Sequence, residues 1–182
     1  YVAGSLIIKE NGAFFNRIVI ISPEGETCSY DKRHLFRMGG EEKVYSVGKE
    51  ILTVNINGWR VRPFICYDLR FPVWSRNSSD GYDLAVYCAN WPAARAYHWD
   101  TLLRARAIEN QCYVAGVNRT GIDGKGIHYR GGSCVIGFRG DEIFSAGSEP
   151  VIHTAELSFQ DLLDYRKDFP AWMDADDFRI IP

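Results

Sequence analysis

A cysteine and a lysine that each follow an apolar, strand-like run are the residues of this sequence with the clearest chemical potential. Cys66 comes directly after the run at 59–65, and Lys32 comes after the run at 18–21, a turn at 23–26 and a short predicted strand. A cation beside a thiol favours the thiolate and can later hold a developing oxyanion. Because side chains at strand ends can meet in one cleft, this arrangement predicts the site of a thiol amidohydrolase.

Both residues also have a plain structural interpretation: Cys66 as a buried strand thiol, and Lys32 as a solvated cation in a polar turn. The position of Cys66 favours the nucleophile. A short helix is predicted over 68–77, and a helix N-terminus just after the thiol lowers a thiol pKa. The N–H of Tyr67 would then be the simplest donor to an oxyanion.

Several longer segments resemble the nitrilase (carbon-nitrogen hydrolase) superfamily. They are the lysine segment at 30–36, Cys-Tyr-Asp-Leu-Arg-Phe-Pro at 66–72, Asn-Trp-Pro at 90–92 and the stretch from 98 to 111. The closing segment at 165–172 is similar to the omega-amidase branch of that family. The resemblance covers residues 1–182. It implies an α/β fold, the four-layer α-β-β-α sandwich with a mixed sheet, and a Glu-Lys-Cys triad that Lys32 and Cys66 match.

The first glutamate of that triad has no counterpart in this sequence. In the family it follows an early strand upstream of the lysine segment, whereas here the upstream acids Glu10, Glu24 and Glu26 sit beside turn signals. We therefore expect that the N-terminal units of the fold, including the general base, are missing from this chain. Residues 1–182 would then be the C-terminal portion of a single carbon-nitrogen hydrolase domain, inactive by itself.

A second glutamate in the family lies between the lysine and the next strand and holds the lysine in place. Its spacing to Gly48 assigns this role to Glu41, with Glu42 as the near rival. Either carboxylate could instead belong to a loop that faces water.

The predicted substrate-binding residues are Tyr67, Asn90 and Trp91. Asn90 and Trp91 end a buried strand, where α/β folds place ligand contacts. Tyr129 is a further candidate for the pocket wall, although a packed aromatic ring explains each of these side chains nearly as well.

Three polar side chains near this site are predicted to be structural. Arg70 either pairs with a neighbouring acid or faces a substrate carboxylate, and the structural role is favoured. His98 is expected to be a hydrogen-bonded helix residue rather than the base of a Cys-His pair. Glu109 lies three residues after Arg106, a spacing typical of an ion pair on one helix face.

The resemblance implies that small ω-amides of dicarboxylates are hydrolysed, such as the 2-oxo acids derived from glutamine and asparagine. It implies a homodimer and calls for no metal or organic cofactor. Two alternatives remain open. The chain is an inactive nitrilase-like binding module, or it hydrolyses N-carbamoyl compounds or nitriles on the same scaffold.

Composition agrees with one globular domain. The 182 residues are 46% hydrophobic and 24% charged, and the net charge of −2 argues against a nucleic-acid surface. No apolar stretch approaches the roughly 18 residues that span a bilayer, so no membrane partner is expected. The five cysteines are odd in number and widely spaced. They predict neither a disulfide framework nor a zinc site, and a reducing cytoplasm is the simplest location.

Hydrophobic periodicity and turn signals predict the elements that position these residues. Asn-Gly at 11–12 and at 57–58 predicts two hairpins, the second pairing 51–56 with 59–66. An apolar run at 83–89 predicts a strand covered on both faces, and 97–111 an amphipathic helix. Further strands are predicted at 112–118, 133–137 and 151–157, a Gly-rich loop at 120–126, and a helix capped by Ser158 that ends near residue 167.

Overall fold

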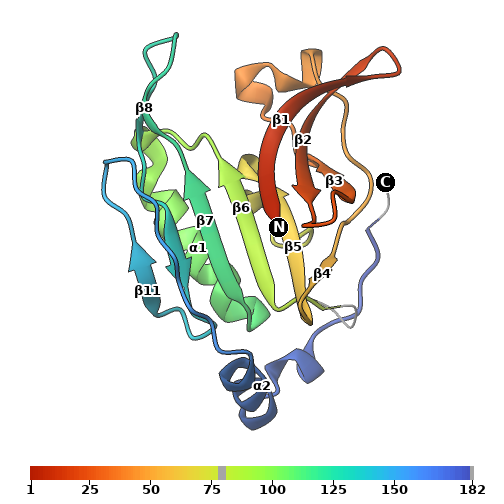
Figure 1. The fold of residues 1–182 in the computed structure, drawn as a ribbon, viewed down its shortest axis with the longest axis vertical. Helices are drawn as coiled ribbons and strands as arrows, with labels where there is room; N and C mark the ends of the chain where they lie inside the picture. The colour runs from red at the N-terminus through yellow and green to blue at the C-terminus, as the bar shows by residue number, and fades with distance from the viewer. Residues whose placement is uncertain (78–80, 181–182) are drawn as a thin grey trace.

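Two main sheets and a small hairpin make up the β structure of the computed structural model, which describes residues 1–77 and 81–180 (Figure 1). The first sheet is antiparallel, in the order β1 (Val2–Glu10), β2 (Ala13–Ile21) and β3 (Thr27–Asp31). The second has the order β11 (Glu142–Ser145), β10 (Cys134–Ile136), β7 (Tyr113–Asn118), β6 (Leu84–Ala89), β5 (Trp59–Ile65) and β4 (Val54–Ile56). Its three central strands are parallel and the others antiparallel, so the predicted mixed sheet is confirmed.

Both predicted Asn-Gly hairpins form. Asn11 and Gly12 have φ of 50° and 81°, and Asn57 and Gly58 have φ of 50° and 86°. A type I′ turn needs positive φ at both central residues, which Asn and Gly adopt at little cost. The first turn joins β1 to β2 and the second joins β4 to β5, although β4 starts at residue 54 rather than 51.

The helix α1 (Ala96–Asn110) covers one face of the six-stranded sheet, as the predicted helix at 97–111 requires (Figure 1). Its inner face carries Trp99, Leu103 and Ala107, all fully buried against the sheet. Gly116 on β7 permits this close packing, because a Cβ there would lie 2.5 Å from a methyl carbon of Leu103. The predicted Arg106–Glu109 ion pair is present at 2.9 Å.

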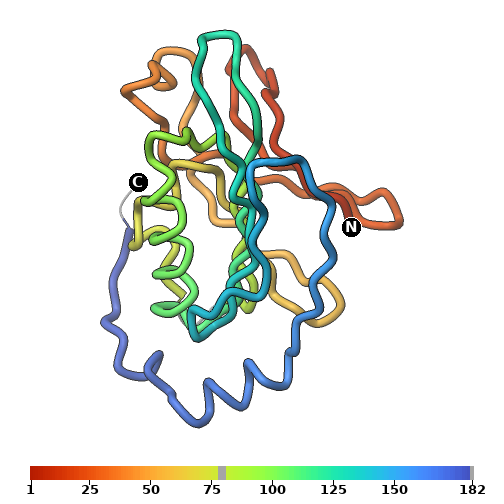
Figure 2. Tube along the Cα trace, turned by 90° about the vertical axis from the view of Figure 1, so that its left-hand side faces the viewer, coloured from red at the N-terminus to blue at the C-terminus, as the bar shows by residue number. Residues whose placement is uncertain are grey.

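The three-stranded sheet packs against the other face of the large sheet through Ile18 and Ile20 of β2, which share the main core with Phe64 and Ile65 of β5. The order is therefore helix, sheet, sheet. The second helix, α2 (Phe159–Asp168), lies at one end of the fold, and the chain beyond it runs back along the molecule (Figure 2). The predicted cap of α2 is confirmed, since the hydroxyl of Ser158 accepts a hydrogen bond from the Asp161 N–H at 3.2 Å. No helix in the described ranges is long and apolar enough to cross a bilayer.

Three sequence predictions of secondary structure are wrong. Residues 151–157 form no strand, because this exposed segment has no neighbouring strand with which to pair. The Gly-rich loop at 120–126 is partly regular, since β8 (Thr120–Ile122) pairs with β9 (His128–Arg130). In place of the helix predicted over 68–77, the structure has only the short 3₁₀ turn η3 (Cys66–Arg70). The side chain of Asp68 caps its start, and Pro72 comes two residues after its end.

Candidate active site

Cys66 stands on a sharp turn at the end of β5, where the strand passes into η3. Its φ is +42°, in the left-handed region that a residue with a side chain rarely adopts. Such strained backbone persists where the surrounding structure holds it, and it is frequent at functional sites. The sulfur of Cys66 lies 3.9 Å from the Asn90 carbonyl oxygen.

The electrostatics of Cys66 differ from the sequence prediction. The five-residue 3₁₀ turn supplies no long helix dipole, and burial raises the pKa of the Cys66 thiol above its ordinary value. The positive charge of Lys32 opposes this shift and is the largest of the influences that lower the pKa. The thiol is therefore mostly protonated at neutral pH, and a base must take its proton when it reacts.

Lys32 is held on both sides of its backbone and at its charged end. Its N–H donates to the Asn16 carbonyl and its carbonyl accepts from the Gly48 N–H, each at 2.9 Å. Only glycine fits at position 48, because a Cβ there would lie 2.0 Å from the Asp31 carbonyl oxygen. The side chain of Lys32 is 2% exposed, so its ammonium needs a partner inside the protein.

Glu41 supplies that partner, as the sequence predicts. The Lys32 ammonium lies 2.6 and 2.9 Å from the two carboxylate oxygens of Glu41. The Phe36 N–H also donates to this carboxylate, at 2.8 Å, and thereby orients it. Glu41 begins the 3₁₀ turn η2 (Glu41–Lys43), whereas Glu42 is exposed, which confirms the assignment of the pair to Glu41.

All six residues predicted for the site line one cavity of about 750 Å³. Cys66, Lys32 and Glu41 contribute to it from the ends of β5 and β3 and from η2, and the remaining three are Tyr67, Asn90 and Trp91. Tyr129, the further candidate, lies in the same wall. A thiol, a buried ammonium and amide groups around one cavity are suited to nucleophilic attack on a carbonyl carbon with stabilisation of the resulting oxyanion.

Arg70 contacts a ring and a histidine rather than the acid that the sequence favours. Its guanidinium lies 4.9 Å from the centroid of the Trp91 ring, and one of its nitrogens lies 2.9 Å from Nδ1 of His98. The predicted role of His98 as a hydrogen-bonded helix residue is thus confirmed. Arg70 itself lines the cavity, together with the cationic Arg95 and Lys125.

Two polar residues near the site were missed by the sequence analysis: Asp123 lines the cavity, and Asn118 holds the backbone of Trp91, which lines it. Asn118, buried at the end of β7, accepts from the Trp91 N–H at 2.8 Å and donates to the Trp91 carbonyl at 3.1 Å. Asp123 accepts from the N–H groups of Ile127 and Lys125 and from the Tyr129 hydroxyl, and these bonds lower the pKa of Asp123 below its usual value. Asn118 could have been identified from the sequence, because it is a polar residue at the end of a predicted buried strand, where α/β folds place ligand contacts.

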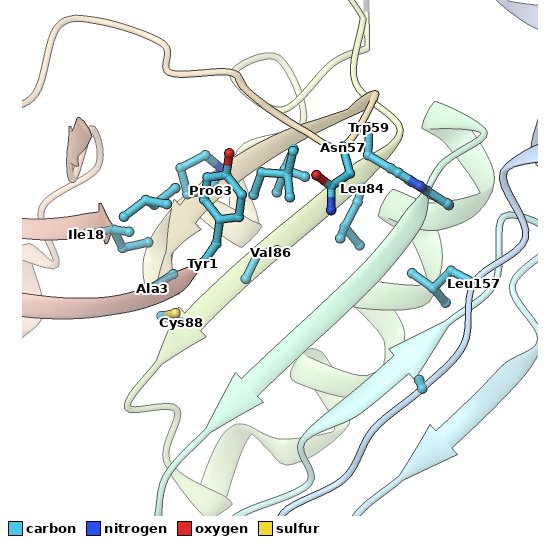
Figure 3. Close-up of a pocket in the computed structure, with 14 residues that line it drawn as sticks. Tyr1, Ala3, Ile18, Asn57, Trp59, Pro63, Leu84, Val86, Cys88 and Leu157 are labelled. Atoms are coloured by element: carbon cyan, nitrogen blue, oxygen red, sulfur yellow. The ribbon is translucent and has the colours of Figure 1, made fainter. Parts of the chain in front are cut away.

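A second cavity, of about 440 Å³, lies between the two sheets (Figure 3). Its labelled lining is largely apolar and includes Ala3 and Ile18 from the small sheet and Pro63, Leu84 and Val86 from the large one. No charged side chain of the described residues lines it, so its Cys88 thiol has no cation or carboxylate beside it of the kind that Cys66 has.

Comparison with known proteins agrees with this geometry. The family model for carbon-nitrogen hydrolases matches residues 1–167. Omega-amidase YafV of Escherichia coli (strain K12) is 53% identical over 180 residues, which are 98% of this chain and 70% of that protein. A 2-oxoglutaramate amidase of Bacillus subtilis (strain 168) is 36% identical over 175 residues, 95% of this chain and 67% of that protein.

A solved structure is similar over nearly the whole chain. It is XC1258 from Xanthomonas campestris, described as a CN-hydrolase superfamily protein with an arsenic adduct in the active site. The TM-score is 0.96 with 46% sequence identity, and the match covers 98% of this chain and 70% of that one. On the family match, the sequence identities and the fold together, this chain belongs to the carbon-nitrogen hydrolase family.

Proposed function

We propose that this chain carries the nucleophile of an amidase that hydrolyses small ω-amides of dicarboxylates through a cysteine acyl-thioester and releases ammonia. One observation carries the proposal. Cys66, on a strained turn, lines the same cavity as an ammonium that Glu41 holds at 2.6 Å. Omega-amidase and 2-oxoglutaramate amidase among the relatives support amide hydrolysis as the reaction class.

In the proposed reaction the sulfur of Cys66 attacks the carboxamide carbon while a base takes the thiol proton. The carbonyl oxygen becomes an oxyanion, which the Lys32 ammonium and the Tyr67 N–H stabilise. When the tetrahedral intermediate collapses, the C–N bond breaks and nitrogen leaves as ammonia after receiving the proton. Water, deprotonated by the same base, then hydrolyses the thioester and restores the thiol.

The base is proposed to be the family's upstream glutamate rather than a carboxylate of residues 1–182. Glu41 and Asp123 are the carboxylates of the described residues that line the cavity. Glu41 is bound to Lys32 and Asp123 accepts three hydrogen bonds, so neither is free to accept the thiol proton. Residues 1–182 alone are therefore proposed to be inactive, since loss of a base costs on the order of 10²–10⁴-fold in rate.

The cations of the cavity support a substrate that carries its own carboxylate. Arg70, Arg95 and Lys125 lie in the wall, and a guanidinium or ammonium stabilises an anionic group that must leave water. An ω-amide of a dicarboxylate has such an anion at the end opposite the amide.

From the family resemblance we also infer a homodimer, and from the odd number and wide spacing of the cysteines a reducing cytoplasm. Size-exclusion chromatography with light scattering tests the dimer.

The experiment compares ammonia release from 2-oxoglutaramate by residues 1–182 and by the same residues preceded by the family's upstream segment. The longer polypeptide is expected to turn over and the shorter one not. Cys66→Ala in the longer polypeptide should abolish turnover, whereas Cys28→Ala, which removes a half-buried thiol of β3, should preserve it. Turnover that survives Cys66→Ala would overturn the mechanism. Robust turnover by the short chain would make Glu41 or Glu42 the base.

The same assay separates the alternatives. Faster turnover of an N-carbamoyl compound or a nitrile than of 2-oxoglutaramate would replace the ω-amide as substrate. A folded longer polypeptide that binds these compounds without turnover would indicate a binding module.

A further inference from the structure

A fully buried carboxylate behind the cavity joins the segment that carries the lysine to the segment that carries the cysteine. Asp68 has an exposed fraction of 0%. One of its oxygens accepts from the Tyr30 hydroxyl at 2.8 Å and from the Ile65 N–H at 3.0 Å. The other accepts from the backbone N–H of His34 at 2.9 Å and lies 2.8 Å from Nδ1 of the His34 ring. Because an ionised carboxylate only accepts, Nδ1 carries the hydrogen in this contact.

These four donors come from both sides of the candidate site. Tyr30 and His34 lie two residues before and two residues after Lys32, and Ile65 directly precedes Cys66. Asp68 therefore binds the two chain segments at the points where they enter and leave the site. A buried carboxylate without such donors would be strongly destabilising, so the segments cannot separate without losing them.

Aromatic packing fixes the His34 ring in this position. The ring stacks on Phe71, with centroids 3.8 Å apart and planes 6° from parallel, and meets the edge of Trp74 at 6.1 Å. The indole N–H of Trp74 in turn donates to the Tyr30 hydroxyl at 2.9 Å. Because Phe71 and Trp74 pack against it, the His34 ring is held in the orientation that points Nδ1 at Asp68.

We propose that Asp68 and His34 are positioning residues, which lock the lysine segment onto the cysteine turn and so keep the Lys32 ammonium beside the Cys66 thiol. The proposal rests on the roles proposed above for these two side chains. It assigns to Asp68 and His34 no contact with substrate and no proton transfer.

Positioning and direct charge predict opposite effects on the thiol. The negative charge of Asp68 by itself raises the pKa of Cys66, whereas the charge of Lys32 lowers it more strongly. If Asp68 acted only as a nearby charge, Asp68→Asn would make Cys66 more acidic. If Asp68 holds Lys32 in place, the same substitution lets the ammonium move away and makes Cys66 less acidic.

The test measures the rate at which iodoacetamide alkylates Cys66 at neutral pH, followed by mass spectrometry of the peptide that contains it. Asp68→Asn is expected to slow alkylation about 3- to 10-fold, because the thiolate fraction changes tenfold for each unit of pKa. An unchanged or faster rate overturns the proposal.

Asp83 provides a matched control at the opposite end of the same strands. It is also fully buried and also accepts several bonds, from Arg60 and Arg166, but it lies beside the start of β5, roughly 20 Å along the strand from Cys66. Asp83→Asn should leave the alkylation rate within about twofold of the wild-type rate. Equal slowing by the two substitutions would indicate general loosening of the fold and would overturn the proposal.

A pair of substitutions at His34 decides the question if Asp68→Asn does not fold. His34→Asn retains an N–H donor close to the position of Nδ1, whereas His34→Leu removes it, and both leave the charge of Asp68 in place. His34→Leu should slow alkylation of Cys66 about as much as Asp68→Asn does, whereas the rate for His34→Asn should stay close to the wild-type rate. Wild-type rates in both variants would overturn the proposal. Alkylation requires neither substrate nor the upstream glutamate, so failure of ω-amide turnover would leave this test intact.

Discussion

Replacing Glu41 by glutamine should reduce both stability and turnover, because it removes the counter-charge of a buried ammonium. Lys32 is 2% exposed and pairs with Glu41 at 2.6 Å. Loss of one partner from a fully buried pair costs about 3–5 kcal/mol. Glu41 is 22% exposed and glutamine keeps one acceptor oxygen, so we expect about 2 kcal/mol. For a chain of this length that lowers Tm by about 4–8 °C.

Glu42→Gln is the matched control, since the neighbouring carboxylate is exposed. Its stability should stay within about 0.5 kcal/mol of the wild-type value. Differential scanning calorimetry measures Tm for both variants. In the polypeptide with the upstream segment, kcat for ammonia release should fall about 10- to 100-fold for Glu41→Gln alone, because Lys32 is no longer aimed at the oxyanion. Equal melting temperatures and equal kcat for the two variants would refute this reasoning.

Three further changes test the scaffold. Arginine contacts lower the pKa of Asp83. The ionised carboxylate therefore contributes its full stability above the unfolded-state pKa near 3.9, and this contribution is lost as pH falls through the lower folded-state pKa. Asp83→Asn should cost about 2–4 kcal/mol at pH 7, and denaturant unfolding measured against pH should no longer show this pH-dependent part of the stability. Gly116→Ala should lower the free energy of unfolding by about 1–3 kcal/mol, because the new methyl would crowd Leu103 and Trp99. Urea titration measures this, and an unchanged unfolding midpoint would show that the two side chains relax freely. Ser158→Ala should cost about 1 kcal/mol by removing the cap of α2, and retention of full stability would contradict that role.

Local chemistry explains the parts of the fold that the sequence predicts well. Asn-Gly dipeptides specify their own backbone geometry, so both hairpins could be recognised without knowledge of their surroundings. The strand predicted from the apolar run at 83–89 and the helix predicted at 97–111 both form, although the helix buries Arg106 and Asn110 and leaves Ile108 exposed, which its apolar pattern did not predict. Of the site, the Glu41–Lys32 pair could be predicted, although through the family resemblance rather than from spacing alone.

Properties that depend on distant partners could not be predicted. Residues 151–157 have a strand-like composition, but a strand exists only where another strand has free backbone groups, and none pairs with them in the described structure. The pKa of Cys66 was expected to fall at a helix start, whereas the depth of burial, a tertiary property, raises it.

The contacts that hold the site together also join residues that lie far apart in the sequence, so they could not be predicted. Asp68 bonds to Tyr30 across 38 positions and to His34 across 34, and Arg70 meets His98 across 28. The sequence by itself determined which residues could react and which local turns would present them. Only the tertiary structure decided which buried charges face one another, because the strength of such an interaction depends on separation and burial, and neither is encoded in the spacing of residues along the chain.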